Sequence, residues 1–169
     1  IADPRILELV EADPGGATRW DGPHVRELVE RAIAMKAEVV AADLKESWLR
    51  EILNYGHTFG HAVEHVEGYR RRHGEAVSIG MTYAAELGRR AGRLAPDVVD
   101  RHRGVLESVG LPTSYEAGRW DALLAAMQRD KKARGSQLRF IVLDDIGTPT
   151  RLVGPDEVLL RAAYDDISH

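Results

Sequence analysis

Histidine is the residue type in this sequence best suited to chemistry, and four of the seven histidines fall within residues 56–74. Three of them follow one another at intervals of four residues, namely His57, His61 and His65. Two residues four apart on a helix lie roughly 40° from each other, so His57 and His61 could share one metal ion or one ligand. Thr58 stands where the zincin motif has its glutamate, so the pattern is not that motif.

A fourth histidine, His73, can reach the same point. Five residues, Gly68–Arg72, precede it after the expected helix end. Extended, they span about 16–18 Å, enough to run back along roughly 15 Å of helix to His57. Neutral imidazoles suit zinc, cobalt or iron, and a catalytic zinc takes three protein ligands. We expect a carboxylate as the third ligand, with Glu64 and Glu75 as local candidates.

Each histidine has an alternative role as a helix cap or as a buried polar group with a satisfied hydrogen bond. We expect that role for His65, which is turned roughly 80° away from His57 on the helix. We treat three others as surface residues, namely His24, His102 and His169.

Two glycines, Gly56 and Gly60, flank His57 inside the helical pattern. Each costs about 1 kcal/mol relative to alanine in a helix, so each needs a reason. Glycine lets a ligand or another backbone approach closely. A binding site and close helix–helix packing explain the two glycines equally well.

Most of the chain has the apolar periodicity of helices. Asp3-Pro4 is typical of a helix start, and Asp13–Gly16 of the end of that short helix. We expect further helices over about 21–40, 44–67, 74–93, 96–109, 120–129 and 155–167.

One short hairpin interrupts the helices. Residues 138–143 predict a strand, 145–149 a turn and 150–153 its partner strand. A two-stranded hairpin is marginal alone, so it must pack on the helices. The predicted fold class is mainly α, a multi-helical domain with one small β-hairpin. No strand leads into a Gly-x-Gly-x-x-Gly turn, which excludes a dinucleotide-binding fold in this chain.

The composition is that of a globular domain, with 44% hydrophobic and 30% charged residues among 169. The lack of cysteine excludes a disulfide scaffold, a thiolate nucleophile and cysteine-ligated zinc. A net charge of -4 and 6% aromatic residues argue against nucleic-acid binding. Without a membrane-length apolar run or a leader, we expect a soluble cytoplasmic protein. The start at Ile1, without methionine, suggests a fragment or a processed product.

The histidine region resembles the C-terminal domain of 3-dehydroquinate synthase. The resemblance rests on Leu53–Glu64, His73–Val77 and Gly80-Met81, and it extends from Ile1 to about Gly147. It implies a two-domain enzyme whose active site lies between the domains. Residues 1–169 would be the helical metal- and substrate-binding C-terminal domain. The N-terminal NAD-binding α/β domain would be absent from this chain. Such an enzyme serves the shikimate pathway, which leads to chorismate and the aromatic amino acids.

The resemblance also implies roles by position. His57 and His73 correspond to the two histidine ligands of a catalytic zinc or cobalt, and His61 to a histidine that contacts the substrate. The other implied catalytic and substrate-binding residues are Lys36, Arg50, Asn54 and one of Lys131 and Lys132. One face of a single helix would then carry Arg50, Asn54, His57 and His61.

The family's third zinc ligand is a glutamate in a helix just before the point where this chain begins. The family's NAD site also lies in the missing half. The resemblance therefore implies that this chain is about half of an enzyme and is inactive alone. Either the chain is a truncated piece, or the other half is a separate chain. The resemblance also suggests a homodimer.

The implied reaction converts 3-deoxy-D-arabino-heptulosonate 7-phosphate into 3-dehydroquinate and phosphate, the work of a carbon–oxygen lyase. A secondary hydroxyl is transiently oxidised by NAD, phosphate leaves by β-elimination, and reduction, ring opening and aldol closure follow. Three alternatives stay open: a related sugar-phosphate cyclase, a metal-dependent polyol or alcohol dehydrogenase, and a non-catalytic domain. The set of Lys36, Arg50 and Asn54 favours the synthase.

Overall fold

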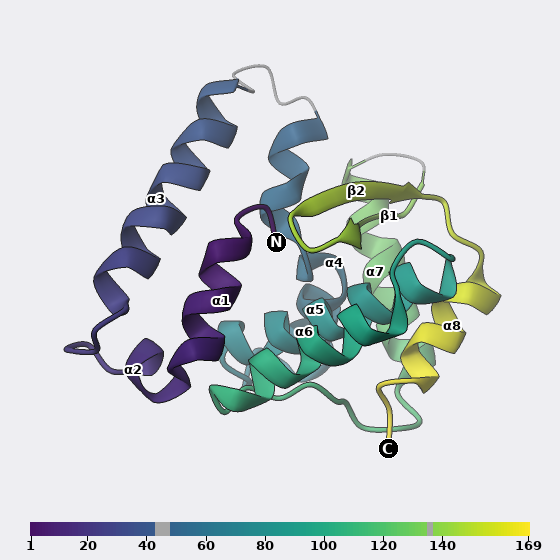
Figure 1. Ribbon diagram of the computed structural model, residues 1–169. Coiled ribbons are helices and arrows are strands. Elements are labelled where there is room, and N and C mark those ends of the chain that lie inside the picture. The colour runs from purple at the N-terminus through teal and green to yellow at the C-terminus, as the bar shows by residue number, and fades with distance from the viewer. Residues whose placement is uncertain (43–47, 135–136) are drawn as a thin grey trace.

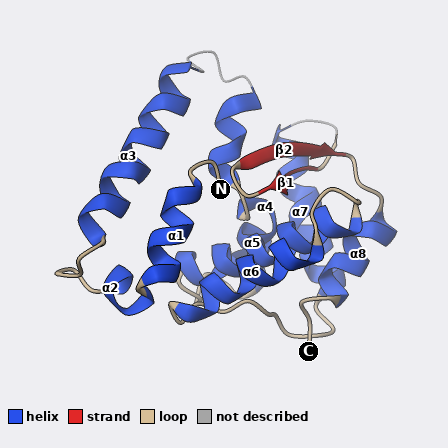
Figure 2. Cartoon of the chain, in the orientation of Figure 1, coloured by secondary structure: helices blue, strands red, loops and turns tan. Residues whose placement is uncertain are grey.

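The computed structural model describes residues 1–42, 48–134 and 137–169, which are mostly helical and carry one β-hairpin (Figures 1 and 2). The predicted fold class is confirmed. The first three helices stand on one side of the molecule, and the later helices gather with the hairpin on the other (Figure 1). Within the described ranges, no helix has both the length and the apolar character that crossing a bilayer requires.

Aspartate caps start the first two helices. Asp3 accepts a hydrogen bond from a backbone N–H of the first turn of α1 (Pro4–Ala12). Asp13 does the same for α2 (Pro14–Thr18), with proline again at the first helical position. The sequence indicated only a helix end at this second point. The cap instead begins a new short helix.

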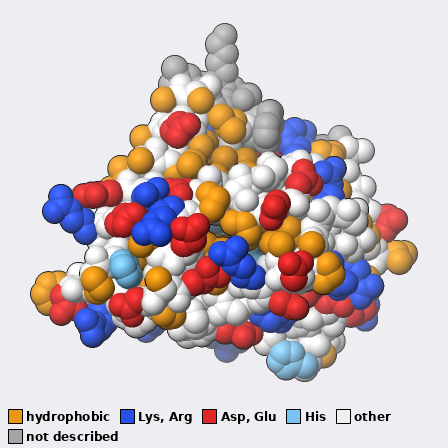
Figure 3. Space-filling model, in the orientation of Figure 1, with side chains coloured by type: hydrophobic (Ala, Val, Ile, Leu, Met, Phe, Trp, Pro, Cys, Tyr) orange, Lys and Arg blue, Asp and Glu red, His pale blue; other side chains and the backbone are white. Residues whose placement is uncertain are grey.

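The long helix α3 (Val25–Ala42) follows the predicted periodicity but is only lightly packed. Val39 is buried, whereas Val29 is 51% and Ile33 is 63% exposed. Hydrophobic side chains are visible on this side of the molecule in Figure 3. The described residues therefore leave part of the apolar face of α3 uncovered.

The expectation of one helix over residues 44–67 is wrong. Residues 43–47 lie outside the described residues, a 3-10 helix, η1, covers Trp48–Asn54, and α4 covers His57–Val66. Gly56, between them, has a φ of 78°, in the left-handed region that glycine adopts readily. The chain therefore changes direction immediately before α4.

The later helices follow the predicted ones, apart from shifts at their ends. Their bounds are α5 (His73–Arg90), α6 (Pro96–Ser108), α7 (Trp120–Arg134) and α8 (Glu157–Asp165). α5 is buried along most of its length and packs against α4, α6, α8 and β1. Tyr83 of α5 stacks on Phe59 of α4 with ring centroids 4.0 Å apart, and its hydroxyl donates to the Leu160 carbonyl of α8 at 3.0 Å.

The hairpin packs on the helices, as predicted. Strand β1 (Arg139–Asp145) pairs antiparallel with β2 (Thr148–Val153). Val142 and Leu143 are fully buried, and each belongs to a hydrophobic cluster that includes residues of α5. The core therefore supplies the support that a two-stranded sheet lacks alone.

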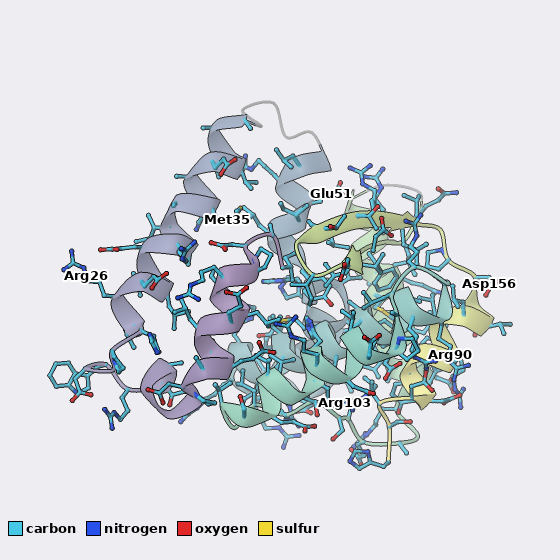
Figure 4. All side chains as sticks on the ribbon, viewed as in Figure 1. Arg26, Met35, Glu51, Arg90, Arg103 and Asp156 are labelled. Carbon is cyan, nitrogen blue, oxygen red and sulfur yellow. The ribbon has the colours of Figure 1, made fainter. Side chains whose placement is uncertain are left out.

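The hairpin also holds the segment that leads into α4. Glu51 of η1, labelled in Figure 4, forms ion pairs with Arg151 at 2.8 Å and with Arg139 at 3.4 Å. Thr58, in the first turn of α4, donates its hydroxyl to the Arg139 carbonyl at 3.2 Å. These contacts position the start of α4.

Glycines allow α4 and α5 to run antiparallel with their backbones in contact. A Cβ added to Gly80 would lie 1.9 Å from the Gly56 carbonyl oxygen and 2.8 Å from the Gly60 nitrogen. A Cβ added to Gly60 would lie 3.0 Å from the Ala76 carbonyl oxygen. The geometry favours helix–helix packing as the reason for Gly56 and Gly60. It also sets the later turns of α4 opposite the start of α5.

His102 is buried, and its assignment to the surface is wrong. Its residue exposure is 4%, and its ring packs edge-on against Tyr55 with centroids 5.5 Å apart. Neither ring nitrogen has a hydrogen-bond partner among the described residues, and burial lowers the pKa of His102 to about 4. One face of α6 meets Tyr55, a contact that no local pattern could reveal. His169 is exposed as expected, and His24 is half-buried.

We expect the buried His102 to make the protein less stable as the pH falls below 6.5. In that range His102 binds a proton in the unfolded chain, whereas in the folded chain its pKa is about 4 and it stays neutral until the pH approaches that value. At pH 5 this effect is about 2 kcal/mol. His102→Phe keeps an aromatic ring against Tyr55 and removes the proton site. Urea unfolding at pH 7.5 and pH 5 should show a smaller loss in the variant. An equal loss in both proteins would contradict the assignment.

Candidate metal centre

Three histidine rings converge between α4 and the start of α5. His57 and His61 lie one turn apart on α4, and His73 is the first residue of α5. The ring centroids are 5.4 Å apart for His57 and His61, 5.5 Å for His57 and His73, and 6.1 Å for His61 and His73. The structure thus brings together the three histidines that the sequence singled out. It does so by packing two antiparallel helices.

A backbone carbonyl fixes the ring of His57. Its Nδ1 atom lies 3.1 Å from the carbonyl oxygen of Tyr55. A carbonyl only accepts, so Nδ1 carries the hydrogen and Nε2 presents the lone pair. Tyr55 is itself buried, which raises the pKa of its hydroxyl and keeps the side chain neutral. Metal-binding histidines usually donate their second N–H in this way, so His57 is oriented for ligation through Nε2.

A carboxylate accompanies His73. The Oε1 atom of Glu64 lies 3.0 Å from the Nδ1 atom of His73. His61, Glu64 and His73 can each offer one ligand atom such that all three atoms lie within 4.8 Å of one another. Glu75, the other local carboxylate, is not in this group of described residues. Imidazole and carboxylate donors without sulfur fit zinc or cobalt.

An open cavity of about 440 Å³ lies beside the histidines, between α4 and α7. His61 and Glu64 line it from α4, and Arg129 lines it from α7. His65 also faces this cavity, with its ring 6.4 Å from that of Tyr69. The sequence did not single out Arg129, because no local pattern links α7 to the histidines.

The predicted substrate-binding residues are spread over several elements. Arg50 and Asn54 lie on η1, whereas His57 and His61 lie on α4, and Gly56 separates the two helices. The prediction that these four side chains share one face of a single helix is therefore wrong. Lys36 is exposed on α3. The side chains of Lys131 and Lys132 lie outside the described residues.

The sequence matches known proteins over nearly its whole length. The family model described as 3-dehydroquinate synthase C-terminal matches residues 1–133. The 3-dehydroquinate synthase of Thermobifida fusca (strain YX) is 61% identical over 168 residues, which is 99% of this chain and 46% of that protein. The chain thus spans about half the length of the curated relatives it matches.

Solved structures share the fold at lower identity. The 2-epi-5-epi-valiolone synthase ValA of Streptomyces hygroscopicus subsp. jinggangensis 5008, solved with NAD⁺ and Zn²⁺, matches with a TM-score of 0.85 at 22% identity. The match covers 99% of this chain and 47% of that one. A 2-deoxy-scyllo-inosose synthase with carbaglucose-6-phosphate, NAD⁺ and Co²⁺ matches with a TM-score of 0.68 at 22% identity, over 86% of this chain and 43% of that one.

Proposed function

The chain belongs to the 3-dehydroquinate synthase family, and we propose that it is the metal- and substrate-binding part of such an enzyme. The whole protein would convert 3-deoxy-D-arabino-heptulosonate 7-phosphate into 3-dehydroquinate and phosphate, as a carbon–oxygen lyase of the shikimate pathway. The observation that carries the proposal is the convergence of His57, His61 and His73 in a chain so similar to these synthases.

The rest of the enzyme would lie in the part of the relatives that this chain does not match. That N-terminal part would supply the NAD site and a glutamate as third metal ligand. Support comes from ValA, whose structure carries NAD⁺ and Zn²⁺ and of which this chain matches 47%. Residues 1–169 would therefore form the helical domain of a two-domain enzyme, which we propose to be dimeric and cytoplasmic.

In this proposal His57 and His73 hold a divalent metal, zinc or cobalt, through their Nε2 atoms. When bound, the metal would act as a Lewis acid toward the hydroxyl that NAD oxidises and later regenerates. His61, one turn from His57, lies at the cavity and can hold or move a proton there, since an imidazole nitrogen can accept a proton and donate it again.

Four basic or amide side chains would bind the anionic substrate. Arg50 offers a planar fork that can bind a carboxylate with two hydrogen bonds, and Asn54 follows it on η1. Lys36 adds positive charge from α3, and one of Lys131 and Lys132 would do so from α7. Arg129, which lines the cavity, is a further cation near the histidines.

The test is phosphate release from 3-deoxy-D-arabino-heptulosonate 7-phosphate with NAD and zinc, by this chain alone and by this chain with the N-terminal part. We expect release only in the second case and no net formation of NADH. In that mixture Arg50→Ala should raise KM about tenfold to a hundredfold, the effect of losing a charged hydrogen bond, and leave the metal content unchanged.

Other results of this assay point elsewhere. Release from a different sugar phosphate only would assign the protein to the related cyclases. Stoichiometric NADH without phosphate would indicate a polyol dehydrogenase. Metal loss in Arg50→Ala would give Arg50 a structural role. No metal and no substrate binding, even beside the N-terminal part, would indicate a non-catalytic domain.

A further inference from the structure

Glu64 and His73 form a pair whose two members differ sharply in burial. The Glu64 side chain on α4 is 12% exposed, whereas the His73 side chain at the start of α5 is 58% exposed. Their Oε1 and Nδ1 atoms lie 3.0 Å apart. The surrounding residues therefore leave much of the His73 side chain exposed to solvent. The ring lies beside the rings of His57 and His61, and its printed hydrogen-bond contact is with Glu64.

We propose that Glu64 is a positioning residue that holds His73 for metal binding and is not itself a metal ligand. The inference rests on the proposed metal-binding role of His73. An ionised carboxylate only accepts hydrogen bonds, so Nδ1 of His73 carries the hydrogen and Nε2 keeps the lone pair. A carboxylate in this place fixes the ring and makes the imidazole a stronger ligand.

The placement of Glu64 on α4 agrees with this role. Glu64 follows His57 by seven residues and His61 by three, so it lies on the helix face that carries both. The antiparallel packing of α4 and α5 then sets it against His73. His57 receives the equivalent support from the Tyr55 carbonyl. Each proposed histidine ligand is thus held through Nδ1, one by the backbone and one by a side chain that can be mutated.

The competing role for Glu64 is direct ligation, since His61, Glu64 and His73 have ligand atoms within 4.8 Å of one another. The two roles make different demands on the side chain. A positioning residue needs only a hydrogen-bond acceptor near Nδ1, which a glutamine oxygen provides. A ligand needs the carboxylate charge, and its oxygen would bind the metal instead of accepting the hydrogen bond from His73.

The experiment is a Co²⁺ titration of the full-length protein against a competing chelator, without substrate, together with the visible absorption of the bound cobalt. We expect Glu64→Ala to weaken Co²⁺ binding about tenfold to a hundredfold, the range for partners of metal-binding histidines. Glu64→Gln should recover most of that loss, and the cobalt spectrum should stay unchanged in both. Glu75→Ala, which removes the other local carboxylate, is the matched control and should bind Co²⁺ normally.

Two results would overturn the proposal. If Glu64→Gln loses Co²⁺ as fully as Glu64→Ala and alters the spectrum, Glu64 is a ligand. If neither variant changes the affinity, or the parent protein binds no Co²⁺, Glu64 has no positioning role. Because the titration needs no turnover, a protein that binds Co²⁺ as expected but releases no phosphate would refute the proposed reaction and leave the role of Glu64 standing.

Discussion

Replacing His57 by alanine should remove the metal from the full-length protein and abolish phosphate release. The ring that is lost is the one that the Tyr55 carbonyl orients, with its Nε2 turned away from that hydrogen bond. Losing the hydrogen-bonding partner of a ligand lowers the metal affinity about 10- to 100-fold. Losing the ligand itself should lower the affinity further. Metal content after dialysis and phosphate release from the heptulosonate phosphate measure the two effects.

His65→Ala is the matched control for this prediction. His65 lies on the same helix, is exposed, and packs beside Tyr69 rather than among the three converging rings. This variant should keep its metal. If His57→Ala also kept the metal at the parent level, the ligands would be the group of His61, Glu64 and His73, and the assignment of His57 would be wrong.

Replacing Gly80 by alanine should unfold or strongly destabilise the domain. The added methyl group would lie 1.9 Å from the Gly56 carbonyl oxygen, a backbone atom that cannot turn aside as a side chain can. α4 and α5 would have to separate, at a cost of about 3 kcal/mol or more, the upper part of the range for overpacked cores. Urea unfolding followed by circular dichroism measures the loss. Any folded fraction should bind metal weakly, because the histidines would move apart.

Gly104→Ala on α6 provides the comparison for Gly80→Ala. An added Cβ at this exposed helical position meets no atom within 4 Å. Alanine is favoured over glycine in a helix by about 1 kcal/mol, so this variant should be slightly more stable than the parent. A Gly80→Ala protein within roughly 0.5 kcal/mol of the parent, the usual range for surface changes, would show that the two backbones do not touch.

The break at Gly56 is the feature of the site region that sequence reasoning predicted incorrectly. The apolar periodicity runs through Gly56, so the sequence predicts a single helix over 44–67. The left-handed conformation of Gly56 accompanies contact with α5, where an added Cβ would lie 2.7 Å from the Met81 nitrogen. A residue 25 positions away in the sequence therefore bears on where the helix begins.

His102 was missed for a similar reason. Its place on an amphipathic helix is compatible with either surface or core, and the choice depends on whether Tyr55 packs above it. Glu64 was named from the sequence as a possible ligand because it is a carboxylate close to the histidines in the chain. The contact with His73 that suggests a different role comes from the packing of α4 on α5.

The sequence by itself determined the element types, most helix starts, the hairpin, the family, and the group of histidines that meet. These depend on residues a few positions apart, whose spacing, caps and side-chain chemistry act locally. The tertiary structure decided that η1 and α4 are separate, that His102 is buried, and that Nδ1 of His57 and of His73 are occupied by Tyr55 and Glu64. The contact of His57 with Tyr55 is local, two residues apart, but it forms only because the chain turns at Gly56. The other outcomes depend on residues far apart in the chain, namely the packing of α4 on α5 and of Tyr55 on His102.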